Sequence, residues 1–196
     1  MRRSRRRVLL TGAALLITPC ASGAARTCDA QAVTPTSGSP AAIERIREQF
    51  ARMEREAPAY RRTTHDVYDF SLEGGELTGF YRGDELRKLS ARLYGESWRG
   101  REAYYFAGGE LIFIHLVHER YVEPFARGGE IAATIEHRFY FDGGRLIRQI
   151  RTQNPPAGDL SMFDPELPML LRNAELFAAC AAAAAPDAPG CTAPNP

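Results

Sequence analysis

Two histidines and an acid in one apolar segment are the first residues of this chain with types suited to chemistry. His115 and His118 lie three positions apart, and Glu119 follows directly. On a helix this spacing would place both imidazoles on one face, as a metal site requires. The segment Glu110–Val117 instead has the apolar composition of a central strand, where residues three apart point to opposite faces. The two histidines are therefore not expected to share one ion.

His115 could instead meet His137 across neighbouring strands. With Glu119 as a nearby acid, this arrangement gives the alternative hypothesis of a periplasmic hydrolase or a metal-dependent enzyme. His115 shares its expected face with Phe113 and Val117, however, which favours a hydrogen-bonded core histidine. We therefore assign no catalytic residue, no metal ligand and no cofactor, and we favour a non-enzymatic protein.

A further histidine–acid pair lies near the start of the expected sheet. His65 and Asp69 are four positions apart, so on a strand they share a face. Acid–base work would need a third group that orients or reacts with them. We interpret both residues as the ordinary polarity of an edge strand.

Aromatic residues carry the leading hypothesis for function. Adjacent aromatics in a strand must point to both faces of the sheet, so one set builds the core and the other is covered or exposed. An exposed tyrosine-rich face is suited to docking a partner or a ligand. We expect an exported, non-enzymatic binding or interaction module whose aromatic sheet face takes a protein or a small apolar ligand. The residues expected on that face are Tyr81, Tyr105 and Tyr140.

Three copies of one short pattern organise the chain. Each copy has two aromatic residues, a turn with glycine and a leucine, at Phe80–Leu86, Tyr105–Leu111 and Tyr140–Leu146. Aromatic residues favour strands, and glycines reach the positive φ angles of tight turns, so each copy predicts a hairpin. Alternation with period two predicts strands near residues 61–72, 76–82, 86–94, 101–107, 110–121, 132–142 and 145–152.

The hairpin unit resembles those of many uncharacterised exported bacterial proteins and is loosely similar to the Tyr/Gly hairpins of MORN-type repeats. The resemblance covers about residues 70–150. The leucines at 86, 111 and 146 are spaced by 25 and then 35 residues, so the chain is not a strict repeat array. The resemblance implies an exported sheet built from hairpins and transfers no functional residue.

Helices are expected on both sides of the strand region. Ser39 and Pro40 have the N-cap and first-turn arrangement of a helix start, and apolar residues then recur at helical spacing up to Glu56. A second helix is expected to begin between Asp164 and Glu166. The fold class is therefore α+β: a curved antiparallel meander of about seven strands with an N-terminal amphipathic helix and a C-terminal helix.

The N-terminal segment has the composition of an export signal. Residues 1–7 are basic, and residues 8–17 form an apolar stretch too short to span a bilayer. Cleavage is expected after Ala32, and Ala24 offers a competing site. The arginine-rich start fits the twin-arginine route and the general secretory route, while Pro19 before Cys20 disfavours a lipoprotein. We expect a periplasmic or secreted protein with no transmembrane segment after cleavage.

The mature chain divides into three parts. Residues 33–40 have linker composition, residues 41–185 form a single α+β domain, and residues 186–196 form a flexible tail. Loss of residues 1–32 removes six arginines and one acid, so 25 basic and 24 acidic residues become 19 and 23, a net charge of −4. This charge provides no basic stripe for nucleic acid and no polybasic patch for anionic lipid.

Two cysteines remain after cleavage, Cys180 and Cys191. In an oxidising compartment we expect them to form a disulfide that ties the tail to the last helix. Metal ligation by only two thiols is the poorer alternative.

Overall fold

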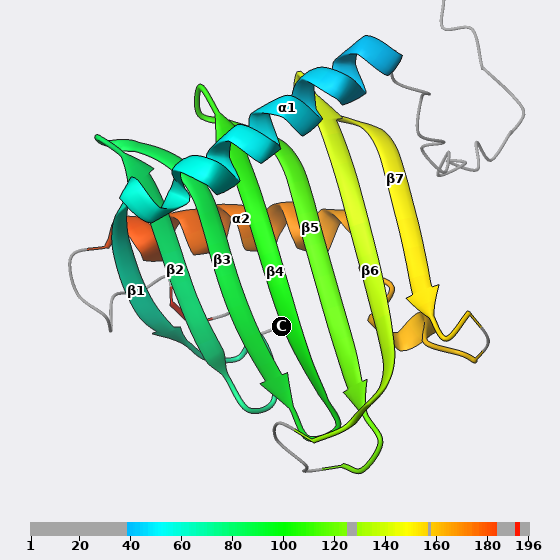
Figure 1. Cartoon of the computed structure of the whole chain (residues 1–196). Coiled ribbons are helices and arrows are strands. Elements are labelled where there is room, and N and C mark those ends of the chain that lie inside the picture. The colour runs from blue at the N-terminus through cyan, green and yellow to red at the C-terminus, as the bar shows by residue number, and fades with distance from the viewer. Residues whose placement is uncertain (1–38, 125–128, 157, 184–190, 193–196) are drawn as a thin grey trace, which may run out of the picture. The chain divides into compact units, whose positions relative to one another are not determined.

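One seven-stranded sheet flanked by two α-helices makes up the computed structural model, which describes residues 39–124, 129–156, 158–183 and 191–192 (Figure 1). The expected export signal and nearly all of the expected linker lie outside these residues. The elements in chain order are α1 (Pro40–Glu56), the 3-10 helix η1 (Ala57–Ala59), β1 (Arg61–Val67), β2 (Gly75–Arg82), β3 (Glu85–Gly95), β4 (Trp98–Ala107), β5 (Glu110–Tyr121), β6 (Ile131–Asp142), β7 (Arg145–Asn154), the 3-10 helix η2 (Ser161–Phe163) and α2 (Leu167–Ala182).

The sheet is an antiparallel meander in which the order of the strands in space follows their order in the chain. The three aromatic–glycine–leucine units are the hairpins β2–β3, β4–β5 and β6–β7. Gly108 and Gly109 have φ angles of 59° and 81°, and Gly143 and Gly144 have 55° and 72°, as a tight hairpin turn requires. The predicted α+β meander is confirmed.

The first strand is shorter than the sequence predicts. β1 ends at Val67 because Asp69 adopts a φ of 65°, which interrupts the extended backbone. Tyr68 then forms a parallel bridge with Thr192 near the end of the chain. Asp69 therefore does not share a strand with His65, and the possible pair of these two residues is absent.

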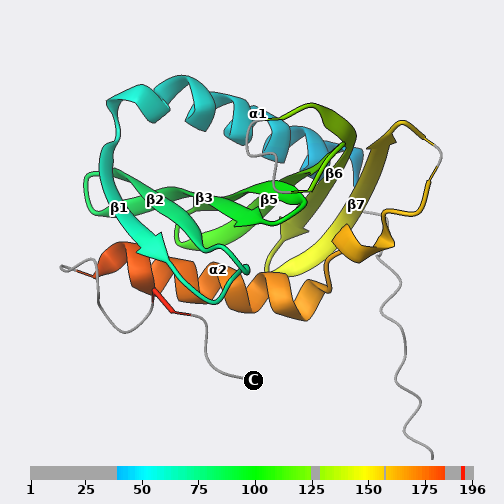
Figure 2. The ribbon, with the colours of Figure 1, turned by 90° about the horizontal axis from the view of Figure 1, so that it is seen from below.

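Each face of the sheet is covered by one helix (Figure 2). α1 buries its apolar stripe on one face of the sheet, where it contacts β5 and β6. α2 packs on the opposite face against β1, β2 and β3. The close approach of α2 depends on Gly79, because a Cβ atom there would lie 2.8 Å from the Cβ of Ala181. Strand β5 thus has protein on both sides, as its apolar composition predicts.

The helix starts agree with the sequence in one case and differ in the other. Ser39 caps α1 by accepting a hydrogen bond of 3.1 Å from the Ala42 amide, with Pro40 as the first helical residue. α2 begins at Leu167, slightly later than expected, because Asp164 and Glu166 both have extended backbone angles. Asp164 instead pairs with Arg151, at 2.7 Å.

The expected disulfide between Cys180 and Cys191 is confirmed. It joins the last turns of α2 to the short described segment at the end of the chain. Within the described ranges, no helix is both long and apolar enough to cross a membrane.

Candidate functional site

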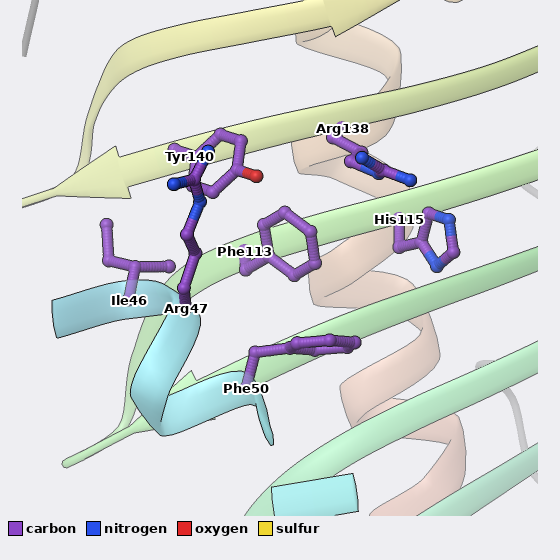
Figure 3. Close-up of a pocket in the computed structure, with 7 residues that line it drawn as sticks. All are labelled: Ile46, Arg47, Phe50, Phe113, His115, Arg138 and Tyr140. Atoms are coloured by element: carbon purple, nitrogen blue, oxygen red, sulfur yellow. The ribbon is translucent and has the colours of Figure 1, made fainter. Parts of the chain in front are cut away.

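A cavity of about 350 Å³ lies between α1 and the middle of the sheet, within the size range of small-molecule sites (Figure 3). One helix and two adjacent strands supply its walls. Its lining residues are Ile46, Arg47 and Phe50 from α1, Phe113 and His115 from β5, and Arg138 and Tyr140 from β6.

Helical and strand periodicity place these side chains together. Ile46 and Phe50 are one helical turn apart, so both point from α1 toward the sheet. On the sheet, Phe113 is paired with Tyr140 in the register of β5 and β6, and two residues further on His115 is paired with Arg138. Cross-strand partners share a face, which gives the cavity an aromatic half and a polar half.

The aromatic half is a packed cluster. The ring of Phe50 lies 5.0 Å from the ring of Tyr105 and 5.2 Å from that of Phe113, in edge-to-face geometry. The rings of Phe113 and Tyr140 are 4.8 Å apart. Tyr105 is further held by the hydrogen bond of 3.0 Å that its hydroxyl donates to Glu54 on α1. The wall that would face an apolar ligand is therefore fixed by packing.

The polar half is organised around Glu136. His115 Nε2 lies 2.5 Å from the Glu136 carboxylate, and Arg138 donates to the same oxygen from Nε and Nη2 at 2.9 and 2.6 Å. The Thr152 hydroxyl donates to the other oxygen at 3.2 Å. Partial burial alone would raise the pKa of Glu136, but the hydrogen bonds from Arg138 and His115 outweigh burial and lower it. Glu136 is therefore a charged, fully engaged carboxylate.

Arg47 brings a second guanidinium to the cavity from the helix side. Figure 3 shows its side chain extending from α1 toward Tyr140. Hydrogen bonding to Tyr140 and then to Glu44 raises the pKa of Arg47. Its ion pair with Glu44 is long, at 3.4 Å, and both side chains are well exposed. Such a pair contributes little, so the guanidinium is available to an anionic ligand.

The three tyrosines expected on a water-facing surface do not form one. Tyr81, Tyr105 and Tyr140 are only 7%, 2% and 3% exposed, and Tyr81 belongs to the core on the opposite face from the other two. Tyr81 is the second aromatic of its pair, whereas Tyr105 and Tyr140 are the first of theirs. Because strand residues alternate, the true counterparts of Tyr81 are Phe106 and Phe141. Only Tyr140 lines the cavity, with Tyr105 packed against Phe50.

The alternative set of His115, His137 and Glu119 does not converge. In the register of β5 and β6, His137 is paired with Leu116 rather than with His115, so the two histidines lie on opposite faces. Glu119 shares the face of His115 but bonds to Arg99, at 2.6 Å. This set therefore cannot act as one catalytic or metal site.

A second cavity, of about 210 Å³, lies on the α2 face and was missed by the sequence-based expectations. Its polar lining consists of Glu102, His118, Asp164 and Asn173, and the remaining lining residues are apolar and come mainly from β3, β4, η2 and α2. Glu102 is opposite Leu116 in the register of β4 and β5, so it is a diagonal neighbour of His118. Alternation from Tyr104 and Leu116 places both residues on this face, but their burial depends on how η2 and α2 dock.

Burial shifts the pKa values of Glu102 and His118 in opposite directions. It raises the pKa of Glu102 although the Tyr104 hydroxyl donates to the carboxylate at 2.6 Å. It lowers the pKa of His118 to about 4, and the neighbouring His137 adds to the effect. Both shifts favour the neutral form of each side chain.

Comparison with known proteins adds no relative to this picture. No protein-family model, curated protein sequence or solved structure is significantly similar to the chain. The two cavities and their side chains are therefore the basis for assigning a function.

Proposed function

We propose that the protein is an exported binding module that holds a small amphipathic anion, an apolar body carrying a carboxylate, between α1 and strands β5 and β6. One observation carries this proposal: an aromatic-lined cavity has a guanidinium at its rim from each side, Arg47 from the helix and Arg138 from the sheet. The basic and apolar N-terminal sequence supports export.

The division of the cavity suits such a ligand. Phe50, Phe113 and Tyr140 provide the apolar contact, and two guanidiniums provide charge-assisted hydrogen bonds to a carboxylate. Arg138 keeps its bond to Glu136, so its guanidinium is held in place before the ligand arrives. Preorganisation of this kind lowers the entropic cost of binding.

The state of Glu136 favours binding over catalysis in this cavity. Its lowered pKa keeps the carboxylate charged, and His115, Arg138 and Thr152 occupy its oxygens. A carboxylate in this state is a poor proton donor and a poor nucleophile. Its role here is to position Arg138, at the cost of a negative charge that competes with the ligand for the same guanidinium.

A pair of matched fluorescent probes tests the proposal. Anilinonaphthalenesulfonate has an aromatic body with an anionic group, and N-phenylnaphthylamine has the same body without charge. The sulfonate should bind the folded protein more tightly, and Arg138→Gln or Arg47→Gln should each weaken sulfonate binding roughly threefold to tenfold. Binding of the neutral probe should change by less than twofold in both variants, because this probe has no charge to pair with an arginine.

The control is Arg101→Gln, which removes an exposed arginine of the same sheet face outside the cavity. Near-ultraviolet circular dichroism should show that every variant keeps its tertiary packing. Equal loss of sulfonate binding in the Arg101 and Arg138 variants would show a general charge effect and contradict the proposal. Equal affinity of the wild-type protein for the two probes would contradict it as well.

The α2-face cavity supports a second candidate function, acid–base hydrolysis of a small ester. Glu102 with its raised pKa is a candidate proton donor, and neutral His118 is a candidate base in the same cavity. Environments that push two pKa values in opposite directions are typical of acid–base pairs.

Release of nitrophenol from a panel of p-nitrophenyl esters tests this candidate. Turnover should fall by at least about a hundredfold in Glu102→Gln and in His118→Gln, and it should be unchanged in His115→Gln on the other face. Turnover at the same low rate in all four proteins would reject the enzyme.

A further inference from the structure

Three buried metal-ligating side chains meet next to the disulfide. His65 lies on β1, Cys180 lies near the end of α2, and Cys191 lies in the last described segment. A ring nitrogen of His65 and the two sulfur atoms all lie within 4.8 Å of one another. All three residues are buried, with exposed fractions of 6%, 0% and 3%. These residues line neither the cavity under α1 (the anion cavity) nor the cavity with Glu102 and His118 on the α2 face (the acid–base cavity).

The state of His65 is the second observation that points to a ligand. Among the described residues, neither of its buried ring nitrogens has a hydrogen-bond partner. Its neighbours on this face are core residues such as Val67 and Leu77. The interpretation of His65 as ordinary edge-strand polarity is therefore wrong, since the side chain points into the core. A buried imidazole without hydrogen bonds is destabilising, and its position beside two sulfur atoms is explained if it serves as a ligand.

We propose that reduction of the Cys180–Cys191 disulfide turns this cluster into a three-ligand site for a thiophilic cation, Cu(I) or Zn(II). Two thiolates and one neutral imidazole are the donors that these ions prefer. A dithiol reductant supplies two electrons and two protons, the S–S bond breaks, and the reductant becomes a disulfide. Each cysteine thiol then releases its proton when its sulfur binds the cation.

Other bonds hold the ligands near one another when the disulfide is open. The Tyr68 amide donates to the Cys191 carbonyl at 3.1 Å, and Tyr68 also bridges to Thr192. On the α2 side, the Thr63 hydroxyl donates to the Ala181 carbonyl at 2.9 Å. The first bond ties the residue just after β1 to Cys191 itself, and the second ties β1 to the residue that follows Cys180. The three donors are therefore positioned by the fold and not only by the covalent link.

The disulfide and the bound cation exclude each other. A sulfur atom in a disulfide has no thiolate charge to offer a metal, and a metal-bound thiolate is protected from forming a disulfide. Metal occupancy would therefore follow the redox conditions around the protein.

The test is metal titration of reduced and oxidised protein under anaerobic conditions. Co(II) serves as a spectroscopic probe, because thiolate ligation gives an intense sulfur-to-cobalt charge-transfer band. The reduced wild-type protein should give this band and bind one ion per chain, and the oxidised protein should give none. Competition with chromophoric chelators then measures the affinities for Cu(I) and Zn(II) separately.

His65→Phe is the decisive variant and His137→Phe is its matched control. His137 is also buried, but it lies on β6, where its Nε2 is 3.2 Å from an Asp164 carboxylate oxygen, and it is not among the three clustered ligands. In the reduced state, His65→Phe should weaken binding of at least one of the two ions by about tenfold or more, and His137→Phe should leave both affinities unchanged. Equal affinity of the His65 variant and the wild-type protein would leave only two thiols as ligands and overturn the proposal.

A folding measurement covers the case in which the reduced protein unfolds without metal. Zn(II) should then restore native circular dichroism to the wild-type and His137→Phe proteins but not to His65→Phe. Failure of Zn(II) and Cu(I) to restore the wild-type protein would also overturn the proposal, as would a folded reduced protein without a charge-transfer band.

Discussion

The Tyr104 hydroxyl donates a hydrogen bond of 2.6 Å to the Glu102 carboxylate, and both side chains lie buried on the α2 face of β4. Within the described part of the chain, Glu102 has no ion-pair partner among the bridges shorter than 4 Å. A buried carboxylate with one neutral donor is unfavourable to ionise, which accounts for its raised pKa.

Glu102→Gln should stabilise the protein at neutral pH. The amide removes the buried charge, and its oxygen can still accept from Tyr104. Because the pKa of Glu102 is raised on folding, native stability falls as pH rises above the unfolded value. The free energy of unfolding of the variant should therefore exceed that of the wild-type protein by on the order of 1 kcal/mol at about pH 7.5 and should equal it at about pH 4, as measured by urea unfolding. Tyr104→Phe, which leaves the carboxylate without its donor, should be destabilising at neutral pH, and a stabilised Tyr104→Phe would contradict this account.

His118 should make stability fall in mild acid. Its pKa is lowered on folding from 6.5 to about 4, so the unfolded chain binds more protons between these values. Stability should be fully present above the unfolded pKa and decline as pH falls toward about 4, by up to roughly 3 kcal/mol. His118→Gln should lose this part of the decline, whereas His115→Gln should retain it. An unchanged pH profile in the His118 variant would show that another group is responsible.

Glu136→Gln should increase the affinity of the anion cavity for its ligand. The substitution removes a negative charge that competes with the ligand for Arg138, although the amide oxygen can still accept from the guanidinium. Sulfonate binding should tighten about threefold, and binding of the uncharged naphthylamine should stay constant. Weaker sulfonate binding would mean that Glu136 matters more for holding Arg138 in place than as a competing charge.

Replacement of both cysteines by serine should lower the free energy of unfolding by about 2–4 kcal/mol. The disulfide closes a loop with a sequence separation of 11, and its loss frees the unfolded chain. Urea titration of the double variant and of the chemically reduced wild-type protein, both without metal, should give similar values. A variant as stable as the oxidised protein would show that contacts of α2 alone hold the end of the chain.

Local features of the fold could be predicted because they depend on neighbouring residues. The glycine pairs at 108–109 and 143–144 need positive φ angles, and Ser39 with Pro40 is a strong helix start. The faces of the tyrosines could also have been predicted, had Tyr81 been aligned with Phe106 and not with Tyr105. That error came from matching residue type in place of strand position.

The sites could not be predicted because they depend on long-range placement. The pairing of His115 with Arg138, and not with His137, is set by the connection from β5 to β6, and a one-residue change in register would reverse it. The anion cavity depends on where α1 crosses the sheet, and the acid–base cavity depends on η2 and α2. Nothing in the spacing of residues along the chain fixes these positions.

Strand β5 contributes His115 to one cavity and His118 to the other, so the two cavities lie on opposite faces of the same strand. An insertion or deletion of one residue in β5 would turn the lining of each cavity toward the other. For protein engineering, the consequence is that neither pocket is a portable module. A graft that carries the anion pocket to another scaffold must bring β5 with it, and with β5 comes His118, one member of the acid–base pair.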